Sequence, residues 1–114
     1  MTDDEKLKIR LAEAMGLHCT FPHLLPKEYY YKKEGFICSQ IFDPEHNVLN
    51  QLAAVEAILE DHEIGFEMWV GHESDGTPYA HAHFDKFNKA WNSDAETIEA
   101  ALWGALKQYT ETNF

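Results

Sequence analysis

The middle of this 114-residue chain has no basic side chain other than histidine. Neither Lys nor Arg occurs from Glu34 through Asp85, although that stretch holds eleven acids and five of the seven histidines. The flanking segments balance nine acids with nine bases, so the formal net charge of −11 resides in the middle of the chain. Such a field repels nucleic acid and anionic membranes and favours cations or the basic surface of another protein. A merely solubilising face is the alternative explanation.

Cysteine and arginine are also scarce. Cys19 and Cys38 lie in no CxxC motif, which is typical of reduced thiols rather than of a disulfide framework. Arg10 is the only arginine and there is no glycine-rich phosphate loop, so a phosphate-clamping pocket is disfavoured. The first residues, MTDDEKLKIR, are acidic where a signal peptide needs basic and apolar regions, and no stretch is apolar enough to span a bilayer. These features predict a cytoplasmic protein.

The length and composition predict one domain over residues 1–114, because 45% hydrophobic and 13% aromatic residues suffice for a single core. Three helices are predicted at Asp3–Met15, roughly Val48–His62, and Asp94–Tyr109. Capping boxes in TDDE and SDAE mark the first and third starts, and Asn47 caps the second. The leucine and isoleucine stripes of the first and third helices are expected to pack on the same sheet; they comprise Leu7, Leu11, Ile98 and Leu102.

Two hairpins are predicted between the helices. FEMWVGHESDGTPYAHAHFD turns at Asp-Gly, and EYYYKKEGFICSQIF turns near residues 33–35. A two-residue turn in the first hairpin pairs Val70 with His81, although Pro78 and the polar tip allow a longer loop and another register. Apolar residues alternate onto both faces of these strands. We therefore predict an α+β fold, a small antiparallel sheet covered by helices on both faces in an α/β/α sandwich.

Three segments together resemble a known family. DEKLKIRLAEAMGL, FDPEHNVLNQLAAVEAILE and SDAETIEAALWGALKQY, with the strand pair between the last two, resemble the phage ABA-sandwich domain family of small tailed-phage and prophage proteins. The shared motifs are an AxxMG helix end, an Asn/Asp-Pro entry into a central helix and an Ala/Leu-rich C-terminal helix; the segment from Leu17 to Glu34 does not align. The resemblance implies a three-layer fold and a bacteriophage origin, and it transfers no catalytic residue.

His81 and His83 form the one pattern that suggests metal chemistry. On a strand, H-x-H places both imidazoles on one face about 7 Å apart, a span that a zinc or nickel ion bridges when a third ligand joins. His72, Glu73 or Asp85 is a candidate third ligand. A chain with seven histidines produces this spacing by chance, and no HExxH or paired CxxC accompanies it. We expect no cofactor, and we keep a metal-dependent enzyme as an alternative.

A cluster of tyrosines and lysines supports a second alternative. Tyr29, Tyr31, Lys32 and Lys33 place aromatic groups beside basic ones, which suits a nucleotide or another small ligand, as in a ligand sponge. Tyrosine also favours strands and lysine favours exposed edges, so a structural explanation competes with it.

The sequence is best explained by a non-enzymatic bacteriophage accessory protein in the host cytoplasm. Its acidic surface is expected to bind a host protein with a basic surface, as an inhibitor or nucleic-acid mimic in counter-defence, without binding nucleic acid or membrane itself. Homo-oligomerisation stays open. Acids provide steering and exposed aromatics provide anchors; the candidate binding residues are Glu56, Glu60, Glu63, Glu67, Glu73, Trp69, Tyr79 and Trp91.

Overall fold

The computed structural model describes residues 2–19, 29–33 and 36–114. These form three helices and two three-stranded antiparallel sheets, with strand orders β1-β2-β3 and β4-β5-β6. The elements are α1 (Asp3–Ala14), β1 (His18–Cys19), β2 (Tyr29–Lys33), β3 (Phe36–Ile41), α2 (Val48–Ile58), β4 (Gly65–His72), β5 (Pro78–Lys86), β6 (Lys89–Ala95) and α3 (Ile98–Asn113).

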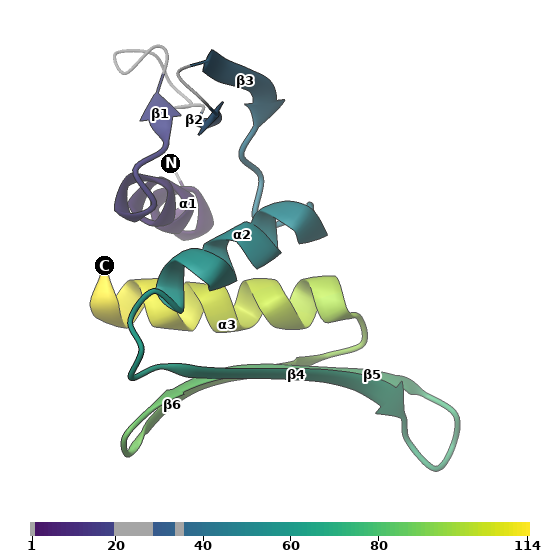
Figure 1. Ribbon diagram of the computed structural model, residues 1–114. Helices are drawn as coiled ribbons and strands as arrows, with labels where there is room; N and C mark the ends of the chain where they lie inside the picture. The colour runs from purple at the N-terminus through teal and green to yellow at the C-terminus, as the bar shows by residue number, and fades with distance from the viewer. Residues whose placement is uncertain (1, 20–28, 34–35) are drawn as a thin grey trace.

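The elements are arranged in layers, as Figure 1 shows. Helix α3 lies directly on the β4-β5-β6 sheet, α1 and α2 pack on the other side of α3, and the β1-β2-β3 sheet lies beyond them. The predicted α+β class, with helices packed on a small antiparallel sheet, is confirmed.

The layer order differs from the predicted sandwich in one respect. Among the described residues, the three helices all lie on one side of the β4-β5-β6 sheet (Figure 1). The burial pattern of β5 gives the reason: Ala80, Ala82 and Phe84 are buried against the helical layer, whereas Tyr79 and His81 on the opposite face remain partly exposed. The apolar groups on that second face are aromatic side chains at a surface and not a second core.

The predicted helix starts were right for α1 and α2 and wrong for α3. Thr2 and Glu5 form the expected capping box, and the Asn47 side chain caps α2. The α3 helix begins at Ile98, four residues later than predicted, and its cap is Thr97 rather than Ser93. Both sites fit a cap by residue type, and strand pairing decides between them, because Ser93 and Asp94 are in ladder with β5.

Strand β6 was not predicted. It joins β5 through a two-residue turn, since Lys86 pairs with Lys89 across Phe87 and Asn88. Phe87 adopts a φ of 55°, a conformation in which glycine, asparagine or aspartate is usual. The turn therefore lacks the Asn-Gly or Asp-Gly signal by which hairpins are found in a sequence.

The predicted alternation within each strand of the β4–β5 hairpin is correct, and the two-residue-turn register is wrong. Trp69 pairs with His81 and Val70 with Ala80, so the register is shifted by one residue. The loop spans residues 73–77, where the Glu73 N–H donates to the Thr77 carbonyl and Gly76 takes a positive φ. A five-residue loop has replaced the two-residue turn. In the upstream hairpin, β2 and β3 pair as expected, and their turn lies outside the described residues.

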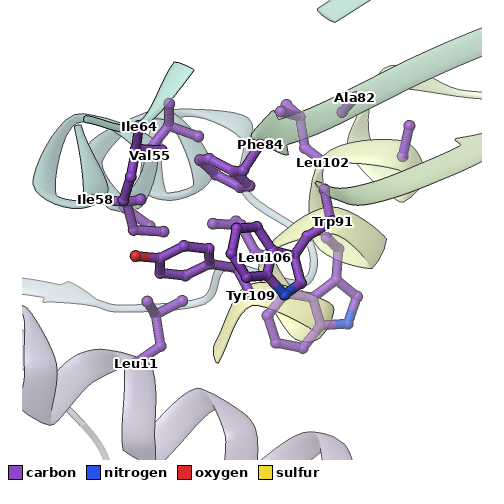
Figure 2. Packing of buried hydrophobic residues seen from close by; sticks show 14 of the residues in the cluster. Leu11, Val55, Ile58, Ile64, Ala82, Phe84, Trp91, Leu102, Leu106 and Tyr109 are labelled. Carbon is purple, nitrogen blue, oxygen red and sulfur yellow. The ribbon is translucent and has the colours of Figure 1, made fainter. Parts of the chain in front are cut away.

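The core is formed by α3, the inner sheet face and the facing sides of α1 and α2, as Figure 2 shows. Leu11, Phe84, Leu102 and Leu106 are fully buried, and Tyr109 packs on both Phe84 and Trp91. The other residues of the predicted stripes are also inside or near the core: Leu7 is buried and Ile98 is partly buried. Each helix in the described part of the chain is too short or too polar to cross a bilayer.

Helix α3 approaches the sheet closely at Gly104. A methyl group on Gly104 would overlap both the Oγ and the Cβ of Ser93 on β6. Rotation of the serine side chain moves the Oγ and leaves the Cβ in place, so the overlap cannot be relieved without moving the helix.

We expect Gly104→Ala to destabilise the protein by about 1–2 kcal/mol, because overpacking outweighs the roughly 1 kcal/mol by which alanine is the better helix former. Adding Ser93→Gly should recover part of the loss by removing the overlapping atoms. Urea unfolding of the two single variants and the double variant measures both effects. A Gly104→Ala variant more stable than the wild type would show that α3 does not depend on this contact.

Candidate functional site

The face of the β4-β5-β6 sheet that points away from α3 carries a connected set of polar and aromatic side chains. We call it the outer face. Cross-strand pairing sets Glu67 opposite His83, Trp69 opposite His81, and His81 opposite Asp94. Because side chains alternate along a strand, these residues share the face that Ala80, Ala82 and Phe84 do not use. The outer face consists of Glu67, Trp69, Tyr79, His81, His83, Asp85, Asn92 and Asp94.

A continuous chain of hydrogen bonds crosses the outer face. Tyr79 donates its hydroxyl to Asp94 Oδ1 at 2.5 Å, and His81 Nδ1 lies 2.6 Å from the same oxygen. His81 Nε2 is 2.7 Å from His83 Nδ1, and His83 Nε2 is 3.2 Å from Glu67 Oε2. Four ring nitrogens therefore face a carboxylate or each other.

Counting protons over this chain defines how many N–H groups it accommodates. Three contacts join Asp94, His81, His83 and Glu67, and each needs one N–H. Two neutral imidazoles carry two N–H groups and leave one contact between acceptors. A third N–H fills every contact, while a fourth would place two donors head to head between the rings. All three contacts are therefore hydrogen bonds only when the two rings together carry three N–H groups.

Asp94 accepts two contacts at the end of the hydrogen-bond chain opposite Glu67, one from Tyr79 and one from His81. The hydroxyl of Tyr79 and then the ring of His81 hold the pKa of the Asp94 carboxyl below its ordinary value of 3.8. The same hydrogen bond raises the pKa of Tyr79 above its ordinary value. Because the carboxyl pKa is lowered on folding, its stabilising contribution is present above pH 3.8 and is lost as the pH falls through the folded-state pKa.

Trp69 is the exposed aromatic residue of this face. Its ring stacks on His81 with centroids 5.5 Å apart and contacts Tyr79 at 5.0 Å. The side chain is nevertheless 49% exposed. A large ring is thus fixed in orientation by two neighbours and still presents about half of its surface to solvent.

The predicted third metal ligands are not placed equally. His72 lies on the opposite face of β4 from Trp69, because the two positions differ by an odd number, and Glu73 follows in the loop. Asp85 does reach the pair, with Oδ2 3.7 Å from His83 Nε2. Within the described residues, no group of three or more potential ligands is arranged to hold a metal ion.

The predicted acidic block is divided by the fold. Glu67 lies on the outer face, whereas Glu56 and Glu60 are exposed on or directly after α2, on the helical side of the sheet (Figure 1). Glu63 lies 3.7 Å from Lys86, and Glu73 is in the hairpin loop. The five glutamates do not form one surface.

Two further predicted groups have different outcomes. Trp91 is only 7% exposed and packs on Tyr109, so its prediction as an exposed anchor was wrong. It alternates onto the buried face of β6, a strand that the sequence did not reveal. Tyr29, Tyr31, Lys32 and Lys33 are in β2, and their side chains lie outside the part that the structure describes.

Asp94 is the site residue that the sequence missed, since it was assigned to a helix. Its signal was the alternation in KAWNSDA, which sets Trp91 and Ser93 on one face and Asn92 and Asp94 on the other.

The structure also has a pocket of about 260 Å³ among α1, α2 and the end of α3, lined by Leu11, Ile58, Asp61, Tyr109 and Phe114 among others. The outer face lies on the other side of the sheet.

Comparison with protein-family models, curated proteins and solved structures finds no match to this chain. The resemblance to the phage ABA-sandwich family therefore stays a prediction, and the function has to be argued from the outer face itself.

We expect Asp94→Asn to return the pKa of Tyr79 toward its ordinary value of 10.0, because the carboxylate is the main cause of its increase. NMR titration of ring-labelled tyrosine resolves this residue from the other four. Asp85→Asn is the matched control, since Asp85 is on the same face and contacts His83. An unchanged Tyr79 pKa in Asp94→Asn would contradict the observed hydrogen bond.

We expect purified protein to bind no stoichiometric zinc, because all four ring nitrogens of His81 and His83 already face hydrogen-bonding partners. Elemental analysis should then give the same result for the wild type and for the double variant His81→Ala, His83→Ala. One tightly held ion per chain that is lost in the double variant would support a metal site.

Proposed function

We propose that this protein is a non-enzymatic binding protein whose outer face docks on a basic surface of another protein. The observation that carries the proposal is Trp69, an oriented and half-exposed ring among carboxylates. Tryptophan is the residue type most enriched among the anchors that dominate interface energies. A cationic side chain placed over its ring gains a cation–π contact as well.

The carboxylates around the ring fit the same kind of partner. Glu67, Asp85 and Asp94 are all exposed. Three carboxylates lie around the ring, so this group of residues is rich in negative charge. Charges at the rim of an interface steer association, and the central aromatic group supplies most of the affinity. The outer face thus combines an anchor with an electrostatic guide.

The hydrogen-bond chain supports binding by fixing the surface in advance. His81 is held by Asp94 and His83, and Trp69 stacks on His81. A ring that is already oriented loses less conformational entropy when a partner covers it. The two histidines act as positioning residues in this proposal.

Acid–base catalysis is the competing interpretation of the same residues. In its favour, Asp94 orients His81 as a carboxylate orients a general base. Against it, these imidazoles lie on a sheet surface, and the pocket described above is on the helical side. Binding uses the exposed ring together with the carboxylates, whereas catalysis uses Asp94 and leaves the exposed Trp69 ring without a role.

The biological origin of the protein, its location and the class of its target are proposed from the sequence alone. The family resemblance favours a phage protein acting in the host cytoplasm, and the net charge of −11 favours a basic protein target over nucleic acid or membrane. Counter-defence, as an inhibitor or nucleic-acid mimic, is one form of such binding.

Charge reversal on the two sides of the sheet tests the proposal. Glu67→Lys with Asp85→Lys alters the outer face, and Glu56→Lys with Glu60→Lys makes the same change in net charge on the helical side. A partner is first captured from nuclease-treated bacterial lysate on the wild type, and its association rate is then measured against ionic strength. The outer-face variant should associate more slowly and with a flatter salt dependence, while the helical-side variant should match the wild type.

Trp69→Ala tests the anchor in the same assay. We expect roughly 30-fold weaker binding, mainly through faster dissociation. Leu49→Ala is the matched control, because Leu49 is 73% exposed at the start of α2. Equal rates and salt slopes for every variant, or capture that depends only on the helical side, would overturn the proposal.

A further inference from the structure

Strand β4 is an edge strand with an unusually open pairing surface. Within the described part of the chain it has a hydrogen-bonded neighbour on one side only, β5. Its eight residues pair with β5 without a bulge, and GFEMWVGH contains neither lysine nor proline. Bulges, lysines and prolines are the features by which natural edge strands avoid pairing with another chain, and β4 has none of them.

The side chains along β4 are exposed as well. Met68 and Val70 point to the helical side of the sheet, yet they are 46% and 67% exposed. Helix α3 packs mainly over β5 and β6, so these two side chains lie beyond the layer that covers the rest of their face. An apolar strip therefore borders a row of backbone groups that are free to pair.

The other edge of the sheet is protected. Strand β6 begins with Lys89, and the Gln108 side chain of α3 donates a hydrogen bond to the Asn92 backbone carbonyl. A lysine and a covering helix both oppose strand addition. The contrast restricts the pairing surface to β4.

We propose that β4 pairs with β4 of a second copy of this chain, antiparallel across a two-fold axis at Met68 or Trp69. The two sheets then form one six-stranded sheet with a continuous outer face. The dimer does not require a basic partner, because the pairing is made by the backbone edge and by Met68 and Val70; only the choice of register also uses Glu67.

The charges along β4 select the second copy and the position of the axis. Residues opposite each other in an antiparallel pair point to the same face, so only registers that pair even with even positions and odd with odd preserve both faces. Within β4, an axis at Val70 pairs only residues 68–72 of each strand, and an axis at Glu67 opposes two glutamates. Like charges directly opposite each other are unfavourable.

Axes at Gly65, Phe66, Gly71 or His72 pair three residues of β4 or fewer. The two remaining registers, with the axis at Met68 or Trp69, are self-complementary. An axis at Trp69 sets Met68 against Val70 and Glu67 against Gly71, and an axis at Met68 sets Phe66 against Val70 and Glu67 against Trp69. In both, the exposed apolar side chains of the two copies cover each other, and no acid within β4 faces an acid. A basic foreign strand would find only one carboxylate on this strand, Glu67.

Sedimentation velocity over a range of concentrations tests the dimer. We expect a concentration-dependent dimer, because one pair of strands is smaller than the standard interface of about 1,600 Å². Val70→Lys should raise the dimer Kd at least about tenfold by placing a charge in the apolar strip. Leu49→Lys is the matched control, with the same charge change at an exposed aliphatic residue on α2, and it should dimerise like the wild type.

Disulfide trapping tests the register and does not depend on the folding of Val70→Lys. In a Cys19→Ser, Cys38→Ser background, a single cysteine at position 68 or 69 should cross-link rapidly at the two-fold axis, where Cα atoms opposite each other are about 4.5–5.5 Å apart. Cysteine at position 67 or 72 should not, because its copies lie too far apart for the bond.

Several outcomes would overturn the inference. They are a monomeric wild type up to about 1 mM, a Val70→Lys variant that dimerises like the wild type, open-ended assembly in place of a dimer, and cross-linking at positions 67 or 72 only. The two proposals are distinguished by separate results. A Val70→Lys variant that is monomeric and still captures the basic partner supports both proposals. A wild type that dimerises and captures no basic partner supports the dimer alone.

Discussion

The close packing of α3 on the β4-β5-β6 sheet is the contact on which the other layers depend. Small residues make it possible: Ala80 and Ala82 on β5 and Ala101 and Ala105 on α3 are all buried. Gly104 brings the helix so close to Ser93 that no side chain fits between them. Small residues on both sides allow the helix backbone to approach the sheet, while Phe84 and the leucines of α3 supply most of the buried apolar surface.

Helix α3 then serves as the support for the remaining helices. Both α1 and α2 pack on its far side, and the fully buried Gln51 of α2 donates to the Glu99 carbonyl in the first turn of α3. The Arg10 side chain of α1 donates to the carbonyls of Thr110 and Glu111 near the other end. The two ends of α3 are thus connected to different helices. Burial on this side of the sheet leaves the outer face open to solvent.

The side chains of the outer face are held in place by a local network of hydrogen bonds and ion pairs. Its imidazoles are partly buried, so they need partners, and they find them in Asp94, in each other and in Glu67. The network fixes Trp69 without covering it. Binding at this face and pairing along β4 share Glu67 and Trp69, but pairing is made by the β4 backbone and by Met68 and Val70, which point to the helical side.

Local signals were sufficient for several parts of the structure. Capping residues fixed the starts of α1 and α2, alternation separated Trp69 from Val70 on one strand and His81 from Ala80 on the other, and glycine marked the end of α1 and the β4–β5 loop. Each of these depends on residues within a few positions of each other, so the sequence carries them directly. The same alternation set His81 and His83 on one face before any partner was known.

Pairing between distant segments of the chain decided where α3 begins and which residues lie on the outer face. Ser93 and Thr97 both fit a helix cap, and only the ladder between β5 and β6 makes Asp94 a strand residue that contacts His81. Trp91 is buried because β6 exists, and Glu56 is separated from Glu67 because α2 and the outer face lie on opposite sides of the sheet. The sequence by itself determined the local elements, their faces and the acidity of the middle of the chain. The tertiary structure decided which of those charges share a surface, because contacts between distant segments depend on packing geometry that local patterns do not encode.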